Sequence, residues 1–195
     1  WRMTGDVCDN LDRLHEMLDR CLAWQDYVQT GAYPDCDMLP IGRLAVAGGR
    51  GNTERYTRFT HDEQITMMTL WSIFRSPLMI GAEMRRNDEF TLSLLTNSEL
   101  IDMLKNSHSA RQLRRAETQG RGEIIWAAKG EDCKYIALFN TDEAEREISF
   151  DITDIAVGGR EYKARDLWAH EEYPLDGGEL KAKVNANGAR LFKIM

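Results

Sequence analysis

Residues 33–42 read YPDCDMLPIG, a pair of carboxylates followed by a short apolar run. A Gly, Pro and Asp break comes just before this run, which predicts a buried strand that is cut off early. Residues 1–10 read WRMTGDVCDN and place polar side chains directly before a helical stretch. In parallel α/β folds the loops after the strands carry function, because polar groups can meet there without disturbing the packed strands. The first candidates for a site are Arg2, Asp6, Asp35 and Asp37.

The chain from residue 1 to 105 alternates between short apolar runs and helices. Residues 11–28 carry apolar side chains at three- and four-residue steps, with Asp9 or Asn10 as cap. Residues 45–52 read as a loop, and Thr60 with Glu63 predicts a capping box at the start of a largely buried helix. Three further elements are expected: a short strand at 77–82, a helix capped by Asn87 or Asp88, and a helix capped by Asn97 or Ser98. This alternation indicates parallel strands with helices outside.

The character of the sequence changes near residue 108. Short strand-like runs are separated by turn sequences such as KGED and NANG, which predicts a small antiparallel β-sandwich. The expected strands lie at 123–128, 134–140, 146–151, 161–168, 179–184 and 189–194. The fold class is therefore α/β followed by all-β, with one domain over residues 1–108 and a second over 109–195.

Composition excludes some classes of partner. The net charge is −7 and the arginines at 111, 114 and 115 make only a small patch, which argues against nucleic acid or an anionic membrane surface. No apolar run is long enough to cross a bilayer and the first residues do not form a signal peptide. A cytoplasmic location is favoured for the chain as given, and a natural N-terminus further upstream would remove that argument.

The four cysteines have no C-x-x-C pair, so we expect four free thiols, with a Cys8–Cys36 bridge as the alternative. The four histidines are isolated from any metal-ligand pattern, and the glycines of AGGRGN lack the context of a phosphate loop. We therefore expect no metal and no cofactor. The tryptophans at 71, 126 and 168 lie in apolar periodic segments and are expected in the core.

The candidate carboxylates also have simple structural explanations. Asp6 could complement the dipole of the helix that follows it, and Asp35 and Asp37 could be turn residues. Two or more carboxylates and an arginine around one pocket also suit sugar chemistry, in which one acid protonates a leaving oxygen while another attacks or activates water. Spacing alone leaves both explanations open.

Four segments together resemble the second half of glycoside hydrolase family 27, the α-galactosidase and α-N-acetylgalactosaminidase family. They are WRMTGDVCDN, YPDCDMLPIG, DEQITMMTLWSIFRSPLMIGAEMR and EFTLSLLTNSELI. The resemblance implies the C-terminal portion of a (β/α)8 TIM barrel, from the end of strand six to helix eight, followed by an antiparallel β-sandwich. It also implies retaining hydrolysis of terminal α-linked galactose or N-acetylgalactosamine.

The resemblance assigns roles residue by residue. Asp6 matches the general acid/base, and Arg2 matches a residue that hydrogen-bonds the sugar and the catalytic carboxylates. Asp37 and Met38 match residues that line the sugar pocket, and Trp1 and Asp35 match neighbouring motif positions. Tyr33 stands where the family usually has Trp, and Cys36 fills a position that is often Pro or Ala.

The family's nucleophile element and its paired-Asp element are absent from these 195 residues. The resemblance therefore implies that the chain supplies only part of an α-galactoside site, with the other half of the barrel coming from the same or another chain. The isolated chain is expected to be inactive, and a homo-oligomer formed through open strand edges is a further possibility. The competing hypothesis is a non-catalytic carbohydrate-binding or structural module.

Overall fold

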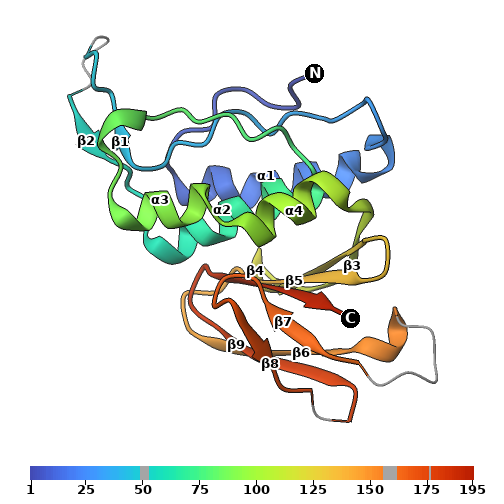
Figure 1. Ribbon diagram of the computed structural model, residues 1–195. Coiled ribbons are helices and arrows are strands. Elements are labelled where there is room, and N and C mark those ends of the chain that lie inside the picture. The colour runs from blue at the N-terminus through green and yellow to red at the C-terminus, as the bar shows by residue number, and fades with distance from the viewer. Residues whose placement is uncertain (49–52, 156–161, 176) are drawn as a thin grey trace.

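The protein, seen here in a computed structural model, has a helical half stacked on a β-sandwich (Figure 1). The structure describes residues 1–48, 53–155, 162–175 and 177–195. The α-helices are α1 (Leu11–Trp24), α2 (His61–Phe74), α3 (Glu89–Leu95) and α4 (Ser98–Asn106). Short 3₁₀ turns lie at Gln25–Tyr27, Met84–Arg86 and Ile152–Asp154.

Each α-helix begins at a side-chain cap. Asn10, not Asp9, caps α1 by accepting a hydrogen bond from the Arg13 amide. The predicted capping box of Thr60 and Glu63 is present at the start of α2. Asp88 caps α3 and Asn97 caps α4, so the cap is the second of the two predicted residues for α3 and the first for α4. The helix starts were predictable because the capping residue and its partner lie within four or five adjacent residues.

The sandwich consists of a six-stranded antiparallel sheet and a two-stranded one. The strand order of the large sheet is β3-β4-β5-β10-β7-β8, and β6 pairs with β9 in the small sheet. The strands are β3 (His108–Thr118), β4 (Arg121–Lys129), β5 (Lys134–Asn140), β6 (Arg146–Asp151), β7 (Ala164–Asp166), β8 (Glu171–Tyr173), β9 (Glu179–Val184) and β10 (Ala189–Ile194). The sandwich prediction is confirmed, and the strand predicted at 161–168 is shorter, with residue 161 outside the described residues.

Two strands of the described sandwich, β3 and β8, were missed by the sequence prediction. β3 is mostly exposed and rich in Arg and Gln, because it is an edge strand and its outer face needs no apolar side chains. Its arginines are neutralised by neighbours: Arg111 pairs with Asp26, Arg114 with Glu123 and Arg115 with Asp19.

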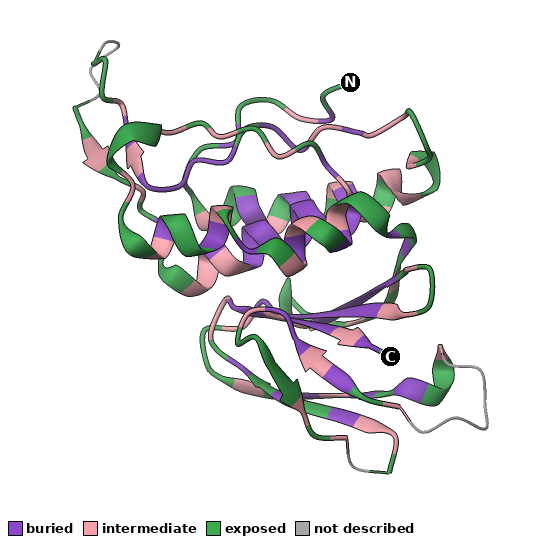
Figure 2. Ribbon diagram, viewed as in Figure 1, coloured by how far each residue is buried: buried purple, intermediate pink, exposed green. Residues whose placement is uncertain are grey.

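The central strands of the large sheet are buried on both faces. Successive residues of β4 alternate between two cores: Ile124 and Trp126 pack with the helices, whereas Ile125 packs against the small sheet. The rings of Trp126 and Phe74, from α2, meet edge to face with centroids 6.2 Å apart. Figure 2 shows buried residues along the helices, the central strands and parts of the extended segments above the helices. The predicted boundary near residue 108 coincides with the start of β3, yet one core runs across it.

Three extended segments lie on the opposite side of the helices from the sandwich (Figure 1). Residues 1–3 pair in parallel with residue 35 through Arg2 and Asp35, and Leu39 pairs in parallel with Ile80. The parallel direction agrees with the prediction, but the expected strands at 38–42 and 77–82 are single bridges, and the described residues form no closed barrel. A parallel strand is usually lengthened by hydrogen bonds to a strand on each side. These segments pair at one position each, so they are too short to count as strands.

A short hairpin flanks the predicted loop of residues 45–52, whose described part, residues 45–48, contains no strand. Its strands are β1 (Arg43–Leu44) and β2 (Arg55–Tyr56). Part of the predicted loop, residues 49–52, lies outside the described residues.

A candidate active site on the parallel segments

Asp37 is the centre of a polar cluster formed by the parallel segments. Its carboxylate oxygen Oδ2 accepts hydrogen bonds from the Arg2 guanidinium at 2.9 Å and from the Val7 amide at 2.7 Å. Its own amide donates to Asp35 Oδ1 at 2.8 Å, and its carbonyl accepts from the indole N–H of Trp71 at 3.0 Å. The Asp37 side chain is only 7% exposed, so these contacts replace water around a buried charge.

The backbone of Asp37 has a left-handed conformation with φ of 81°. This region is uncommon for residues other than Gly, and Asp is among the few that tolerate it. Backbone strain of this kind persists where surrounding contacts fix it, and it gathers at functional sites. At Asp37 the four contacts from Arg2, Val7, Asp35 and Trp71 supply that constraint.

Arg2 joins two candidate carboxylates. Its Nη2 donates to Asp6 Oδ1 at 2.7 Å and to Asp37 Oδ2 at 2.9 Å, so one guanidinium nitrogen lies between both side chains. The hydrogen bond to Asp6, followed by the negative charges of Asp37, Asp6 and Asp35, raises the pKa of Arg2. The Asp6 side chain is 87% exposed, so its carboxylate faces open space on this side of the protein. The cluster thus offers one accessible carboxylate beside one buried carboxylate.

Asp35 and Trp1 fix the position of the first segment. The Asp35 amide donates to the Trp1 carbonyl at 2.8 Å, and the Met3 amide donates to the Asp35 carbonyl at 3.0 Å. The indole ring of Trp1 is largely exposed and lies 6.0 Å from the ring of Trp24. The backbone of both residues therefore supports the cluster, and the exposed indole extends the surface beside it.

Met38 lies apart from the carboxylates in a shallow hollow. Its side chain is half exposed and lines the hollow together with Arg43, Ile80, Gly81 and Glu83. A Cβ at Gly81 would lie 3.1 Å from the Met38 Cβ, so a larger residue there would press on Met38. The structure thus brings Arg2, Asp6, Asp35 and Asp37 together and leaves Met38 on the flank.

Three contributors to the cluster were missed by the sequence prediction. The Val7 amide and the Trp71 indole N–H both bind Asp37, although Trp71 is also a core residue, as expected. A buried ion pair joins Asp9 to Arg55, with oxygen–nitrogen distances of 2.5 and 2.8 Å. No local pattern could reveal this pair, because its members are separated by 46 residues.

The Asp9 pair anchors the β1–β2 hairpin to the loop that carries Asp6. The Arg58 amide also donates to Asp9, at 2.7 Å. Burial alone would raise the pKa of Asp9, but the hydrogen bonds from Arg55 and the Arg58 amide outweigh it and the pKa is lowered. Asp9 is therefore a charged anchor, not a proton donor.

The cysteines are free, as predicted, and the alternative Cys8–Cys36 bridge is not formed. Cys36 instead lies against Cys21, with the two sulfur atoms 3.7 Å apart. Within residues 1–48, 53–155, 162–175 and 177–195, no group of three or more His, Cys, Asp or Glu side chains is placed to hold a metal ion. Across the same residues, no helix has the length and apolar character needed to span a membrane.

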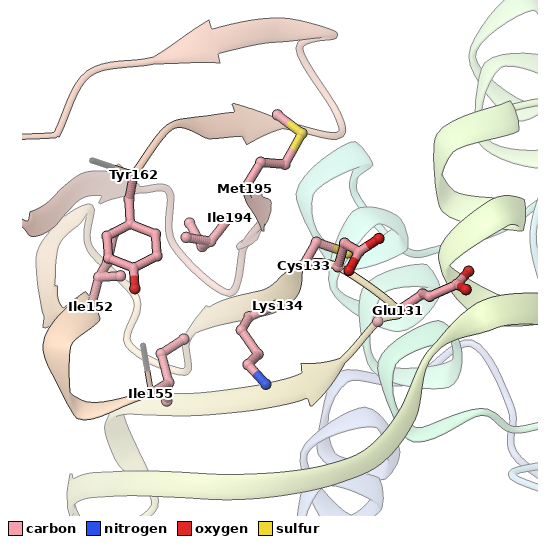
Figure 3. A pocket seen from close by; sticks show the side chains of 10 residues that line it. Glu131, Cys133, Lys134, Ile152, Ile155, Tyr162, Ile194 and Met195 are labelled. Carbon is pink, nitrogen blue, oxygen red and sulfur yellow. The ribbon is translucent and has the colours of Figure 1, made fainter. Parts of the chain in front are cut away.

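The sandwich has a separate cavity at its open end. Its volume is about 220 Å³, and it is lined mainly by Ile152, Ile155, Ile194, Tyr162 and Lys134. Figure 3 shows the tyrosine and isoleucine side chains around this space, which lies on the far side of the large sheet from the helices. It is therefore remote from Asp6 and Asp37.

The chain matches known proteins along its whole length. Residues 1–106 match the family model described as alpha galactosidase A, and residues 121–194 match the alpha galactosidase C-terminal beta sandwich domain. Alpha-galactosidase 2 of Arabidopsis thaliana is 26% identical over 195 residues, which are 100% of this chain and 46% of that protein.

Two solved bacterial structures are more similar. A family 27 β-L-arabinopyranosidase from Geobacillus stearothermophilus is 42% identical with a TM-score of 0.90, covering 100% of this chain and 44% of that one. A putative α-N-acetylgalactosaminidase from Bacillus halodurans is 35% identical with a TM-score of 0.85, covering 98% of this chain and 46% of that one. The chain thus spans less than half the length of these relatives, and it belongs to glycoside hydrolase family 27, the melibiase family.

Proposed function

We propose that the chain forms part of the active site of a retaining glycoside hydrolase that removes terminal sugars of the galactose type. The observation that carries the proposal is the Arg2 guanidinium held between the exposed Asp6 and the buried Asp37. Asp6 acts as the general acid/base, because it is the carboxylate of the cluster that a substrate can reach. Membership of family 27 supports the reaction class.

The other residues bind and orient the sugar. Arg2 donates hydrogen bonds to the substrate and controls the charge beside Asp6. Asp37, which is held rigidly by Val7 and Trp71, accepts from sugar hydroxyls, and Met38 supplies an apolar wall beside it. Trp1 and Asp35 complete the rim. Rigid acceptors of this kind favour one hydroxyl configuration over another.

The proposed substrate class is defined by the ring hydroxyl arrangement that three sugars share. β-L-Arabinopyranose has the ring hydroxyl arrangement of α-D-galactopyranose and lacks its hydroxymethyl group, and N-acetylgalactosamine differs at the 2-position. Relatives named for galactose, arabinopyranose and N-acetylgalactosamine all match this chain. We therefore propose a site that reads the shared ring hydroxyls.

A second carboxylate is required for retention. Retaining enzymes place two carboxyl groups about 5 Å apart across the reacting carbon, one as nucleophile. Asp37 is a poor nucleophile because Arg2 and the Val7 amide already bind the same oxygen. We propose that the nucleophile lies outside residues 1–195, and that residues 1–108 complete a (β/α)8 barrel with another segment, of the same or another chain, while residues 109–195 form the sandwich domain. The 195-residue chain alone is then inactive.

The second candidate is a carbohydrate-binding module without catalysis. The observation in its favour is the cavity at the open end of the sandwich, where Tyr162 offers an aromatic face among isoleucines (Figure 3). Sugar bound there would be unaffected by changes at Asp37.

The two candidates are separated by binding and turnover of nitrophenyl glycosides of α-galactose, β-L-arabinopyranose and α-N-acetylgalactosamine by the 195-residue chain. We expect no nitrophenol release, and weak binding of the shared sugar ring that Asp37→Ala abolishes. The matched control is Asp12→Ala, an exposed carboxylate on α1 that should leave binding unchanged. Binding that survives Asp37→Ala would favour the module, and turnover by this chain would contradict the external nucleophile.

A further inference from the structure

Two buried thiols meet beneath the candidate site without any role in the proposed reaction. The Sγ atoms of Cys21, on α1, and Cys36, between Asp35 and Asp37, are 3.7 Å apart. Both residues are fully buried. The other cysteines are elsewhere: Cys8 is exposed and Cys133 is partly exposed.

We propose that Cys21 and Cys36 are a modification site, a dithiol that a low-molecular-weight disulfide converts into an intramolecular disulfide. A disulfide needs sulfur atoms about 2.05 Å apart, so the two sulfurs must approach from their present van der Waals contact. The inference does not depend on the hydrolase proposal.

The chemistry is balanced with oxidised glutathione as the oxidant. One cysteine thiolate attacks the glutathione disulfide, which gives a mixed disulfide and one glutathione thiol. The second cysteine then displaces the bound glutathione, which forms the Cys21–Cys36 bond and releases a second glutathione thiol. The two protons of the cysteines end on the two glutathione thiols, and the reverse reaction restores the dithiol.

Burial controls when this exchange occurs. Desolvation, and then the contact with Cys36, raises the pKa of Cys21 well above its usual value, so the reactive thiolate is scarce in the closed structure. The exchange therefore needs a local opening of α1 away from residues 35–37. Oxidation should be slow in the folded chain and faster in low concentrations of denaturant.

The bond would join two elements of the candidate site. α1 begins at Leu11, shortly after Asp6, and Cys36 lies between Asp35 and Asp37 in the sequence. The Cys36 amide already donates to Ser76 Oγ at 2.9 Å, so one side of this segment is fixed to the end of α2. A disulfide would fix the other side to α1, and the oxidised state would hold the Asp37 segment more rigidly.

The test uses the 195-residue chain treated with oxidised glutathione, followed by alkylation, intact mass and peptide mapping. We expect a loss of two hydrogen atoms, a Cys21–Cys36 crosslinked peptide, and Cys8 carrying alkyl or glutathione groups. Amide exchange at Cys36 and Asp37 should slow by about 100-fold on oxidation, because the bond closes a short loop. Cys21→Ala is the matched control and should show neither change.

Two results would overturn the proposal. The first is that, after treatment with oxidised glutathione and unfolding, Cys21 and Cys36 still react with the alkylating reagent or carry only separate glutathione adducts. The second is a crosslink that leaves amide exchange at residues 35–37 unchanged, which would remove the coupling to the site. A Cys8→Ser/Cys133→Ser variant, which keeps only the buried pair, repeats the mass measurement without competing thiols.

Discussion

The two sides of the helical layer are stabilised in different ways. On one side, the large sheet packs through apolar residues such as Ile124 and Trp126 and is bonded strand to strand over its length. On the other side, the parallel segments share single bridges, and polar contacts of Arg2, Asp37 and Asp9 add to the burial of their apolar residues. The sandwich side therefore combines buried area with long strand ladders, whereas the site side combines buried residues such as Leu39 and Ile41 with a few specific polar contacts.

Substitutions on the two sides should therefore affect stability in different ways. Loss of apolar volume on the sandwich side should lower the stability of the whole chain, because α2 and the sheet share one core. Loss of a polar contact on the site side should instead release one segment while the rest stays folded.

Trp126→Ala should cause the largest loss. The fully buried indole packs edge to face on Phe74, so its removal leaves a cavity between sheet and helices and should lower the free energy of unfolding by about 3–5 kcal/mol. Urea unfolding followed by circular dichroism measures this. Trp126→Phe is the control, with a much smaller loss, because the buried indole N–H has no partner among the described residues. An equally small loss for Trp126→Ala would contradict the shared core.

Asp37→Ala should release the first segment. The change leaves the Arg2 guanidinium and the Val7 amide without their common acceptor, at a local cost of about 2 kcal/mol. Amide exchange at Met3 and Val7 should accelerate while exchange in β4 stays constant. Asp37→Asn, which tolerates the left-handed backbone, should show an intermediate effect. Equal acceleration in the site segments and in β4 would show that the two sides are not independent.

Glu99 should make the contact between α4 and the sandwich sensitive to acid. The hydrogen bond from Arg165, and then that from His170, lowers the pKa of Glu99 from 4.5 to about 2. Because the folded pKa is depressed, the carboxylate stabilises the fold above about pH 4.5, and this contribution is lost as the pH falls through about 2. Glu99→Gln should lose about 1 kcal/mol at neutral pH and nothing at the acidic limit. Unfolding curves across this range measure the difference, and a constant difference would contradict the pairing.

Tyr33→Leu should have the smallest effect. The Arg75 guanidinium lies 4.9 Å from the centre of the Tyr33 ring, while Arg75 also donates to the Leu104 and Lys105 carbonyls. Loss of the ring should cost about 0.5–1 kcal/mol, because the carbonyl contacts remain. Tyr33→Trp, which restores the family's usual residue, should be neutral or slightly stabilising in the same thermal unfolding assay. A larger loss for Trp than for Leu would show that the ring does not act through Arg75.

Local signals explain what the sequence predicted correctly. Thr60 with Glu63, and Asp88 before its helix, place caps within a few residues of the helices they start. The sandwich strands follow from apolar runs and turns, and β4 reads as continuously apolar because both its faces are buried. The polar edge strand β3 has no such pattern, which is why it was missed.

The candidate site was predictable only in part. Arg2, Asp6, Asp35 and Asp37 were grouped from their places beside the expected strands, but the hydrogen bond between Arg2 and Asp37, which spans 35 residues, was not predicted. The Asp9–Arg55 pair and the Cys21–Cys36 contact had no signal, because neither their spacing nor their flanking residues are distinctive. The parallel segments were predicted as strands because their apolar runs indicate burial. The number of residues that pair depends on neighbouring segments, which an apolar run does not reveal.

The most direct test of the central claim, that Asp6 is the acid/base, is turnover by a graft. Residues 1–195 would replace the matching segment of the Geobacillus arabinopyranosidase, which supplies the rest of that chain. We expect nitrophenol release from the β-L-arabinopyranoside, a loss of about 10²–10⁴-fold in Asp6→Asn, and no loss in Asp12→Asn, an exposed carboxylate on α1. Equal activity of Asp6→Asn and the unmodified graft would contradict the account.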